Sequence, residues 1–368
     1  MPVLEIIFMA AVTGYFIQSV LFAVGASKKF PKSKREENDL PSVSVIVAAR
    51  NEEENILRCM KSLDKIDYPE SKLQILMVDD RSTDKTGNII ENFILDKPKF
   101  TKIETKKEIG RLKGKTNALA NALEIATGEI ILTTDADCVV VPTWINATVS
   151  YYQDDVAMVN GFTTQTANSH FTGMQAIDFI YLLIVAAGTI NLKTPLSCIG
   201  NNMSYRKKAY LEVGGYENLP FSVTEDFNLL MAINKLNKYK IIYPLDKEAL
   251  VTSSACKNLS ALYHQKKRWA VGGVKAPWQG YVLFVFGILT SILTLLLPVF
   301  FSKVWLYLVL FKIATDLFLL LPAYSRLGLT KDLKYFITFE LYCLLYVTAL
   351  PLILLFTGKT VNWKGRKY

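Results

Sequence analysis

The chain carries long apolar segments at both ends, with a region of globular composition between them. The first segment runs from Val3 to Gly25, about 23 residues, which is enough to cross the roughly 30 Å hydrocarbon core of a bilayer. Three further segments lie near the other end: Tyr281 to Pro298, Val304 to Leu321 and Tyr335 to Phe356. This layout predicts a multi-pass membrane protein with a folded domain held at the bilayer surface.

The first apolar segment could also be a cleaved signal peptide. No basic residue precedes it, however, and it is longer than the roughly 7–15 residues of a signal-peptide core. We therefore expect an uncleaved anchor over residues 1–26. The basic residues that follow it are Lys28, Lys29, Lys32, Lys34 and Arg35. Positive flanks stay in the cytoplasm, which predicts a cytoplasmic domain over residues 27–277 and a location in the cell (inner or plasma) membrane.

Residues 278–368 are predicted to form about three transmembrane helices and a basic tail. The basic loop "SRLGLTKDLK" between the last two apolar segments is expected in the cytoplasm. Strict counting then puts the tail "GKTVNWKGRKY" outside, although its basic residues favour the inside. Two interpretations stay open: Pro351 marks a re-entrant hairpin, or the charge rule does not apply here.

The net charge of +9 raises the question of nucleic acid. Much of the excess flanks apolar segments, where anionic lipid is the simpler partner, so we expect contact with the lipid bilayer and no nucleic-acid binding. The five cysteines show no paired metal-ligand spacing. They are expected to be packing residues.

The region between the apolar ends alternates strand and helix patterns. The strand patterns are "VSVIVAA" (Val43 to Ala49), "LQILMVDD" and "EIILTTDAD". The helix patterns are "NEEENILRCMKSL", "RSTDKTGNIIENFI" and "GKTNALANALEIATG", the last ending at Gly128. Alternation of this kind predicts an α/β fold with a mostly parallel, Rossmann-like sheet, whose ligands bind beyond the carboxyl ends of the strands.

Polar residues follow each of these three strand patterns. They are Arg50, Asn51 and Glu52 after the first, Asp79 and Asp80 after the second, and Asp135 and Asp137 after the third. Two acids separated by one residue suit a hard divalent cation, Mg²⁺ or Mn²⁺, held against a diphosphate. The sequence therefore predicts a metal and diphosphate site at this edge of the sheet.

Other phosphate sites are not supported. No GxGxxG follows the first strand, and "GRLKGKT" (Gly110 to Thr116) has three residues between its glycines where a P-loop has four. Lys115 could still meet a phosphate as a point charge, or be a solvated lysine at a helix start. No GxSxG nucleophile motif is present.

A further apolar stretch, Met174 to Leu192, lies inside the globular region. It could be a core helix or an interfacial helix resting on the bilayer, and we favour the interfacial one.

Six short motifs follow one another along the chain. They are "VSVIVAARNEEENI", "MVDDRSTDKT" (with Arg81 where glycine is common), "GKTNALANAL", "TTDADC", "TEDFNL" and "QKKRW". In this order and spacing the chain resembles the membrane-integrated, inverting, GT-A-fold family 2 glycosyltransferases, with their DxD, TED and QxxRW motifs.

The resemblance implies a role for each matching residue. Ala48, Asn51 and Glu52 would line the nucleotide pocket, Asp79 and Asp80 would read the base and ribose, and Asp135 would contact the nucleotide sugar. Asp137, with Asp135, would hold the cation. Asp226 would be the general base, and Gln265, Arg268 and Trp269 would close over the donor, with Trp269 beside the acceptor entrance. An inverting displacement needs one base and a stabilised leaving group, which these residues supply without a protein nucleophile.

Simpler interpretations remain for two motifs. Glu225 and Asp226 could be the acidic first turn of a helix capped by Thr224. "KKRW" could be a basic and aromatic collar at the membrane surface.

The function expected is transfer of a hexose from a nucleotide sugar, by family analogy a UDP-sugar, to a lipid or lipid-linked acceptor. The alternative is a processive polysaccharide synthase of the same family, and a remote alternative is a non-catalytic membrane scaffold. The modest set of C-terminal helices favours the lipid acceptor.

Overall fold

The computed structural model describes residues 2–105, 108–220, 222–273, 277–358, 362–363 and 366–367. Its α/β part contains a seven-stranded sheet of order β3-β2-β1-β4-β8-β6-β9. The strands are β1 (Val43–Ala49), β2 (Leu73–Asp79), β3 (Phe100–Glu104), β4 (Ile130–Asp135), β6 (Val156–Asn160), β8 (Met203–Arg206) and β9 (Lys240–Ile242). Strands β1 to β4 are mutually parallel and β8 is antiparallel to both of its neighbours. The predicted mostly parallel sheet is confirmed.

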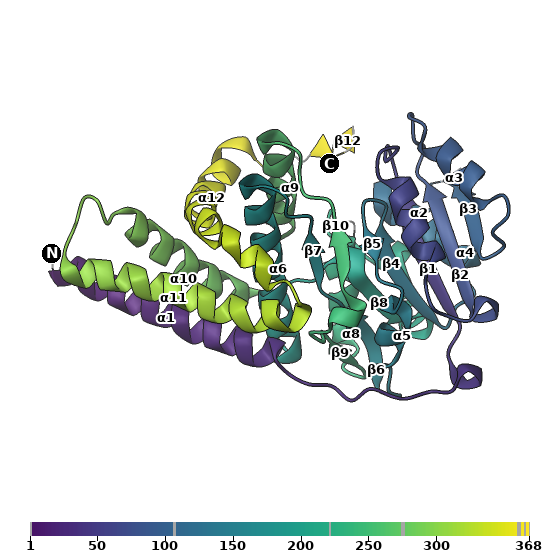
Figure 1. Cartoon of the computed structure of the whole chain (residues 1–368), viewed down its shortest axis with the longest axis horizontal. Coiled ribbons are helices and arrows are strands. Elements are labelled where there is room, and N and C mark those ends of the chain that lie inside the picture. The colour runs from purple at the N-terminus through teal and green to yellow at the C-terminus, as the bar shows by residue number, and fades with distance from the viewer. Residues whose placement is uncertain are drawn as a thin grey trace.

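Helices cover both faces of this sheet (Figure 1). They are α2 (Ile56–Asp64), α3 (Thr86–Ile94), α4 (Gly114–Ile125), α5 (Trp144–Val149), α7 (Lys207–Glu212) and α8 (Glu225–Lys235). A small second sheet of β5 (Val139–Val140), β10 (Val251–Ser253) and β7 (Thr163–Gln165) lies beside β4. Helix α4 ends three residues before Gly128, and Gly128 itself lies against β1, where an added Cβ would be 2.2 Å from the Ser44 nitrogen. The expected helix end at Gly128 is therefore wrong, since the chain must leave the helix to approach β1.

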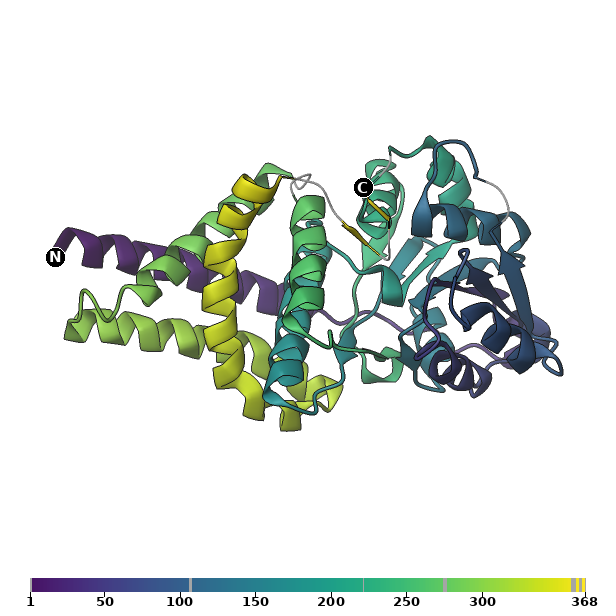
Figure 2. The ribbon, with the colours of Figure 1, turned by 90° about the horizontal axis from the view of Figure 1, so that it is seen from above.

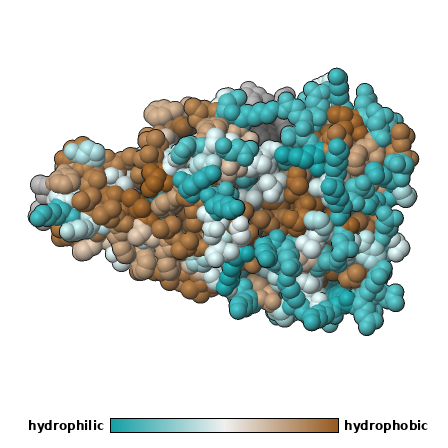
Figure 3. Space-filling model, viewed as in Figure 1, coloured by the Kyte–Doolittle hydropathy of each residue, from teal (hydrophilic) through white to brown (hydrophobic). Residues whose placement is uncertain are grey.

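Five described helices are long and apolar enough to cross a membrane. They lie in α1 (Pro2–Ala26), α6 (His170–Asn191), α10 (Trp278–Leu295), α11 (Lys303–Leu327) and α12 (Phe336–Thr357), the last with the short 3-10 turn Thr330–Tyr335 before it. Helix α9 (Leu259–Gly273) leads from the α/β part back to them. Apolar surface covers the end of the molecule formed by α1, α10 and α11, and polar surface covers the α/β part (Figure 3).

Helices α1, α10 and α11 run beside one another along the long axis of the molecule, whereas α12 lies across them (Figures 1 and 2). Helix α12 packs against α6, α9 and α10, at the junction with the α/β part. Lys312 of α11 joins α11 to α12 through an ion pair with Glu340 of α12 at 2.5 Å. Lys312 also pairs with Asp316 of its own helix at 2.8 Å. Tyr15 of α1 donates a hydrogen bond to Asp316, so the cluster joins three helices.

The stretch left open between a core and an interfacial helix forms α6. Of its most apolar window, 83% is buried inside the molecule. Helix α6 packs against α1, α11 and α12 and also against β7 and β9. It is therefore a core helix between the sheet and the apolar helices, and the interfacial interpretation that we favoured is not supported.

Two glycines allow α1 and α6 to cross in contact. A Cβ on Gly188 would lie 2.6 Å from the Phe22 Cα, and one on Gly25 would lie 2.3 Å from the Gly188 oxygen. Neither backbone can yield easily, so we expect Gly188→Val to lower the free energy of unfolding by about 1–3 kcal/mol, the usual cost of overpacking. Thermal unfolding in detergent measures this. Gly287→Val in α10 is the control, because nothing lies within 4 Å of its added Cβ. Equal stability of the two variants would contradict the close crossing.

Candidate active site

The carboxyl ends of β1, β2 and β4 lie side by side, as predicted. Ala48 pairs with Val78 of β2 and with Asp135 of β4, and Ala49 pairs with Asp79. The polar residues that follow these strands therefore meet at one edge of the sheet.

The loops after β1 and β2 are tied together by hydrogen bonds. Thr83 N–H donates to the Asn51 side-chain oxygen at 2.8 Å, and Glu52 N–H donates to the Thr86 hydroxyl at 2.8 Å. Arg50 donates to the backbone oxygens of Asp80 at 2.7 Å and Arg81 at 2.8 Å. These contacts hold the expected nucleotide residues Asn51 and Glu52 at the sheet edge.

Two residues of these loops have left-handed backbone: Asn51 with φ 51° and Arg81 with φ 55°. Glycine adopts this conformation at no steric cost, which explains why glycine suits the position of Arg81. The Arg81 side chain donates a hydrogen bond to the Thr105 backbone oxygen at 3.1 Å and forms an ion pair with Glu108 at 3.6 Å. Beside it, Asp79 accepts from Ser82 N–H at 3.0 Å and Asp80 is buried.

Lys115 lies at the centre of an acidic cluster. Its Nζ is 2.6 Å from Asp135 Oδ1 and 3.2 Å from Glu225 Oε1. Lys115 comes from the first turn of α4, Asp135 from the end of β4 and Glu225 from the first turn of α8. Lys115 is thus neither a fully solvated lysine nor an isolated charge, since it joins three separate elements.

Asp226 belongs to the same cluster. A Cβ added to Gly200 would lie 3.3 Å from Asp226 Oδ2 and 3.5 Å from Lys115 Nζ, so both groups face one point. Thr133 of β4 holds this backbone in place by donating to the Gly200 oxygen at 2.7 Å. A side chain at position 200 would therefore press against both Asp226 and Lys115, which glycine avoids.

Burial and the neighbouring Glu225 raise the pKa of Asp226 to about 6, against the opposing charges of Lys115 and Arg268. A carboxylate with a pKa near neutrality is a suitable general base, because it is ionised at neutral pH yet holds a proton well. If Asp226 acts in this way, kcat is expected to fall as pH drops through about 6 and to be level above it. A pH profile of kcat tests this, and an acid limb near 4, the ordinary value for aspartate, would contradict it.

Asp137 lies in the turn between β4 and β5. Its Oδ2 accepts from the Ser253 hydroxyl of β10 at 3.3 Å, and its backbone oxygen accepts from Arg58 at 2.9 Å. Among the described residues no cluster of three His, Cys, Asp or Glu could hold a metal. Mg²⁺ usually takes one or two carboxylates and completes its shell with waters and phosphate oxygens, so the two carboxylates of Asp135 and Asp137 would suffice in number for such a cation.

Helix α9 carries Gln265, Arg268 and Trp269, and its last residues lie against the start of α8. A Cβ on Gly272, near the end of α9, would lie 2.4 Å from Thr224, the residue before α8. The charge of Arg268 acts on Asp226. The Trp269 ring lies against Phe179 of α6, with centroids 5.6 Å apart. Gln265 is half-buried one turn earlier.

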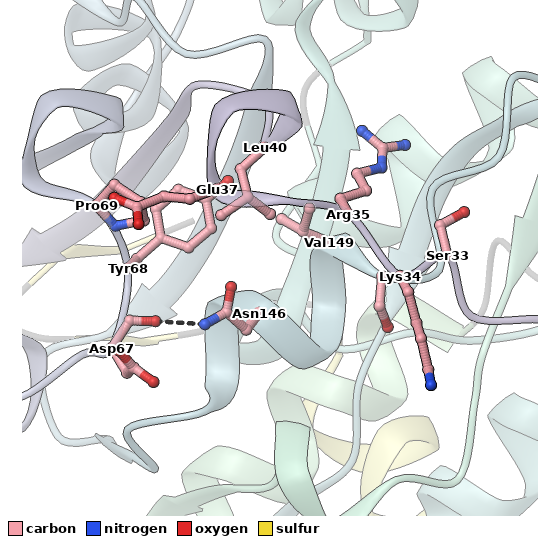
Figure 4. Close-up of a pocket in the computed structure, with 11 residues that line it drawn as sticks. Ser33, Lys34, Arg35, Glu37, Leu40, Asp67, Tyr68, Pro69, Asn146 and Val149 are labelled. Carbon is pink, nitrogen blue, oxygen red and sulfur yellow. Dashed lines mark hydrogen bonds between the residues drawn. The ribbon is translucent and has the colours of Figure 1, made fainter.

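A solvent-open cavity of about 590 Å³ lies elsewhere (Figure 4). Its lining includes Arg35, Leu40 and Tyr68, which precede β1 and β2 in the chain. Asn146 donates to the Asp67 backbone oxygen across it at 2.6 Å. It is at the amino ends of the strands, opposite the edge where ligands bind in such sheets.

Several residues of the site were missed from sequence. Ser253 and Arg58 support Asp137, and Asp178 and Phe179 of α6 contact α9. Only Asp178 gave a signal, as a lone acid in an apolar run.

The structure therefore joins an α/β sheet, with acidic side chains at one edge, to apolar helices long enough to cross a membrane. The sequence profile of Glycosyl transferase family group 2 matches residues 130–357, and that of Glycosyl transferase family 2 matches residues 44–214. The chain belongs to glycosyl transferase family group 2.

Two curated relatives illustrate the range of the family. A beta-monoglucosyldiacylglycerol synthase from Nostoc sp. is 30% identical over 251 residues, 65% of this chain and 50% of the relative. A poly-beta-1,6-N-acetyl-D-glucosamine synthase from Staphylococcus epidermidis is 24% identical over 303 residues, 80% of this chain and 71% of the relative. The chain spans about half the length of the first of these.

A solved structure with the same fold is a mannosyltransferase from Pyrobaculum calidifontis, in complex with GDP-Man and Mn²⁺. It is 21% identical, has a TM-score of 0.61, and the match covers 96% of this chain and 99% of that one. The similarity confirms the expected GT-A-like fold.

Proposed function

We propose that the protein is an inverting glycosyltransferase that moves a hexose from a nucleotide sugar to a membrane lipid or lipid-linked acceptor. The observation that carries the proposal is the cluster of Lys115, Asp135 and Asp226, in which a base with a raised pKa faces the carboxyl edge of the sheet. Membership of a glycosyltransferase family agrees with it.

In this proposal Asp226 accepts the proton of the acceptor hydroxyl as its oxygen attacks the anomeric carbon. The bond from that carbon to the diphosphate breaks with inversion, so an α-linked donor gives a β-glycoside. Ala48, Asn51, Glu52, Asp79 and Asp80 bind the nucleotide, and Gln265, Arg268 and Trp269 close over the donor. The charge of Lys115 lowers the pKa of Asp226, against the opposing effects of burial and Glu225.

Asp135 and Asp137 would hold Mg²⁺ or Mn²⁺, which stabilises charge on the leaving diphosphate when bound. The fold neighbour was solved with Mn²⁺. Dialysis against EDTA is expected to lower transfer at least about 100-fold, and added Mn²⁺ or Mg²⁺ to restore it. Asp137→Asn is expected to require more metal for half-maximal rate. Full activity in EDTA would contradict metal use.

The lipid acceptor is favoured by the surroundings of the base. Helix α9 contacts the apolar helix α12, and Gly272 of α9 lies against Thr224, the residue before α8. We therefore expect an acceptor held by the apolar helices to reach Asp226 along α9. The Nostoc relative is named a beta-monoglucosyldiacylglycerol synthase. The second candidate, a processive synthase, is favoured by the longer match to the staphylococcal polysaccharide synthase.

Membranes incubated with labelled UDP-glucose, UDP-galactose, UDP-GlcNAc and GDP-mannose, then partitioned between organic solvent and water, test the proposal. Label in the organic phase is expected. Label in an ethanol-insoluble polymer would contradict the lipid acceptor and support the processive synthase. No release of UDP or GDP by the wild type would contradict transfer and leave the scaffold interpretation.

The orientation of α12 bears on which side of the membrane holds the C-terminal tail. If α1, α10 and α11 cross the bilayer and α12 lies across them at its cytoplasmic surface, three crossings put the tail in the cytoplasm. Its charges then obey the positive-inside rule without a re-entrant hairpin at Pro351. Residues 359–361, 364–365 and 368 of the tail lie outside the described residues. A cysteine added at the C-terminus should react with impermeant maleimide only in inside-out vesicles; reaction in right-side-out vesicles would contradict this topology.

A further inference from the structure

Asp178 of α6 and Lys266 of α9 form an ion pair in the interior of the protein. Their side chains are 2% and 8% exposed. Replacing such a buried pair by apolar residues is often neutral or stabilising, whereas removing one partner is strongly destabilising. Stability alone is therefore a weak reason for this ion pair. Its position between α6 and α9 indicates a role in holding the two helices.

Lys266 also lies among aromatic rings. Its Nζ is 4.6 Å from the ring centroid of Trp269 and 4.8 Å from that of Tyr346 in α12. Phe179, the residue after Asp178, packs against the ring of Trp269. Two consecutive residues of α6 thus hold two residues of α9 that are three positions apart, on one face of that helix.

Arg268 lies between these two held residues in sequence. Its positive charge lowers the pKa of Asp226, the proposed general base. The same helix meets Thr224 through Gly272. A shift of α9 along α6 would therefore move Arg268 relative to the general base and the donor.

We propose that the Asp178–Lys266 pair is a positioning device, which sets α9 so that Arg268 and Trp269 are placed for transfer and which links them to α12 through Tyr346. The proposal rests on the function proposed above. Neither residue touches the donor; both act through α9.

Three variants test this: Lys266→Met, Asp178→Leu and the double variant Lys266→Met/Asp178→Leu. Each single variant leaves one buried charge, so a lower unfolding temperature and a lower kcat are expected. The double variant removes both charges and is expected to regain the wild-type unfolding temperature. Its kcat is expected to stay about 10- to 100-fold below wild type, the effect of misplacing a catalytic group by about 1 Å. The acid limb of its pH profile is expected to move above 6, because Arg268 opposes protonation of Asp226.

Wild-type kcat in the double variant, or in either single variant, would overturn the proposal. Lys266→Arg keeps the charge and is expected to retain more activity than Lys266→Met; equal loss in both would also overturn it. If the double variant does not fold, Phe179→Leu replaces it, since it removes the ring beside Trp269 without stranding a charge. A wild-type kcat in Phe179→Leu would then count against the proposal.

Hydrogen exchange gives a readout that does not depend on activity. Amides of α9 (Leu259–Gly273) are expected to exchange faster in the folded double variant than in wild type. Unchanged exchange there would overturn the positioning role even if no acceptor were found. An inactive wild type with nucleotide bound would instead contradict the proposed function alone.

Discussion

Asp226→Asn is expected to lower sugar transfer by about 10²- to 10⁴-fold, the usual contribution of a positioned general base. Asparagine keeps the shape of the side chain but cannot accept the proton of the acceptor hydroxyl. Binding of the nucleotide sugar is expected to persist, because the residues proposed to bind the nucleotide follow β1 and β2, whereas Asp226 lies in the first turn of α8. The measurement is kcat beside a titration of donor binding.

Stability provides the control for Asp226→Asn. The pKa of Asp226 is raised to about 6 from an ordinary value of 3.8, so the folded protein holds the proton more tightly than the unfolded chain. Ionised Asp226 consequently costs stability, and this cost grows as pH rises from about 4 to 6 and is complete above 6. The variant is expected to unfold at the same or a higher temperature at pH 7. Loss of activity together with loss of stability would point to misfolding instead.

Lys115→Met is expected to lower both stability and rate. It would leave Asp135, Glu225 and Asp226 facing one another without the cation that joins them. A fully buried broken pair costs about 3–5 kcal/mol, but Lys115 and Asp135 are 32% and 36% exposed, so we expect about 2–3 kcal/mol. Unopposed repulsion would raise the pKa of Asp226 further, and transfer at pH 7 is expected to fall about 10²- to 10³-fold.

Lys113→Met is the matched control, since Lys113 is exposed two residues earlier at the start of the same helix. It is expected to change the unfolding free energy by no more than about 0.5 kcal/mol. Similar effects of the two variants would show that Lys115 acts only as one of several surface charges. An acid limb of the kcat profile that stays at pH 6 in Lys115→Met would likewise show that Lys115 does not control the ionisation of Asp226.

The strands of the sheet were predictable because each is a short apolar run that ends in polar residues. Val43–Ala49 forms β1 with the predicted bounds, and β2 and β4 end at Asp79 and Asp135. Parallel pairing brings such ends together by geometry alone, so the meeting of Asp135 with the loops after β1 and β2 followed from the pattern.

Contacts between distant elements were not predictable in this way. Periodicity does not separate a core helix from an interfacial one, because both are apolar, and only the packing of α6 between sheet and helices decides. Likewise nothing in "GKT" shows that Lys115 meets an acid 110 residues later, at Glu225. The antiparallel strand β8 has four residues, too few for its alternation to be recognised.

In the proposed mechanism the donor binds at the carboxyl edge of the sheet, with its anomeric carbon facing Asp226. The most direct test is a structure of Asp226→Asn with an intact nucleotide sugar and Mn²⁺. We predict the diphosphate beside Asp137 and Lys115 and the sugar between them and residue 226. A donor bound in the cavity near Arg35 and Tyr68, at the opposite edge of the sheet, would rule out donor binding beside Asp226.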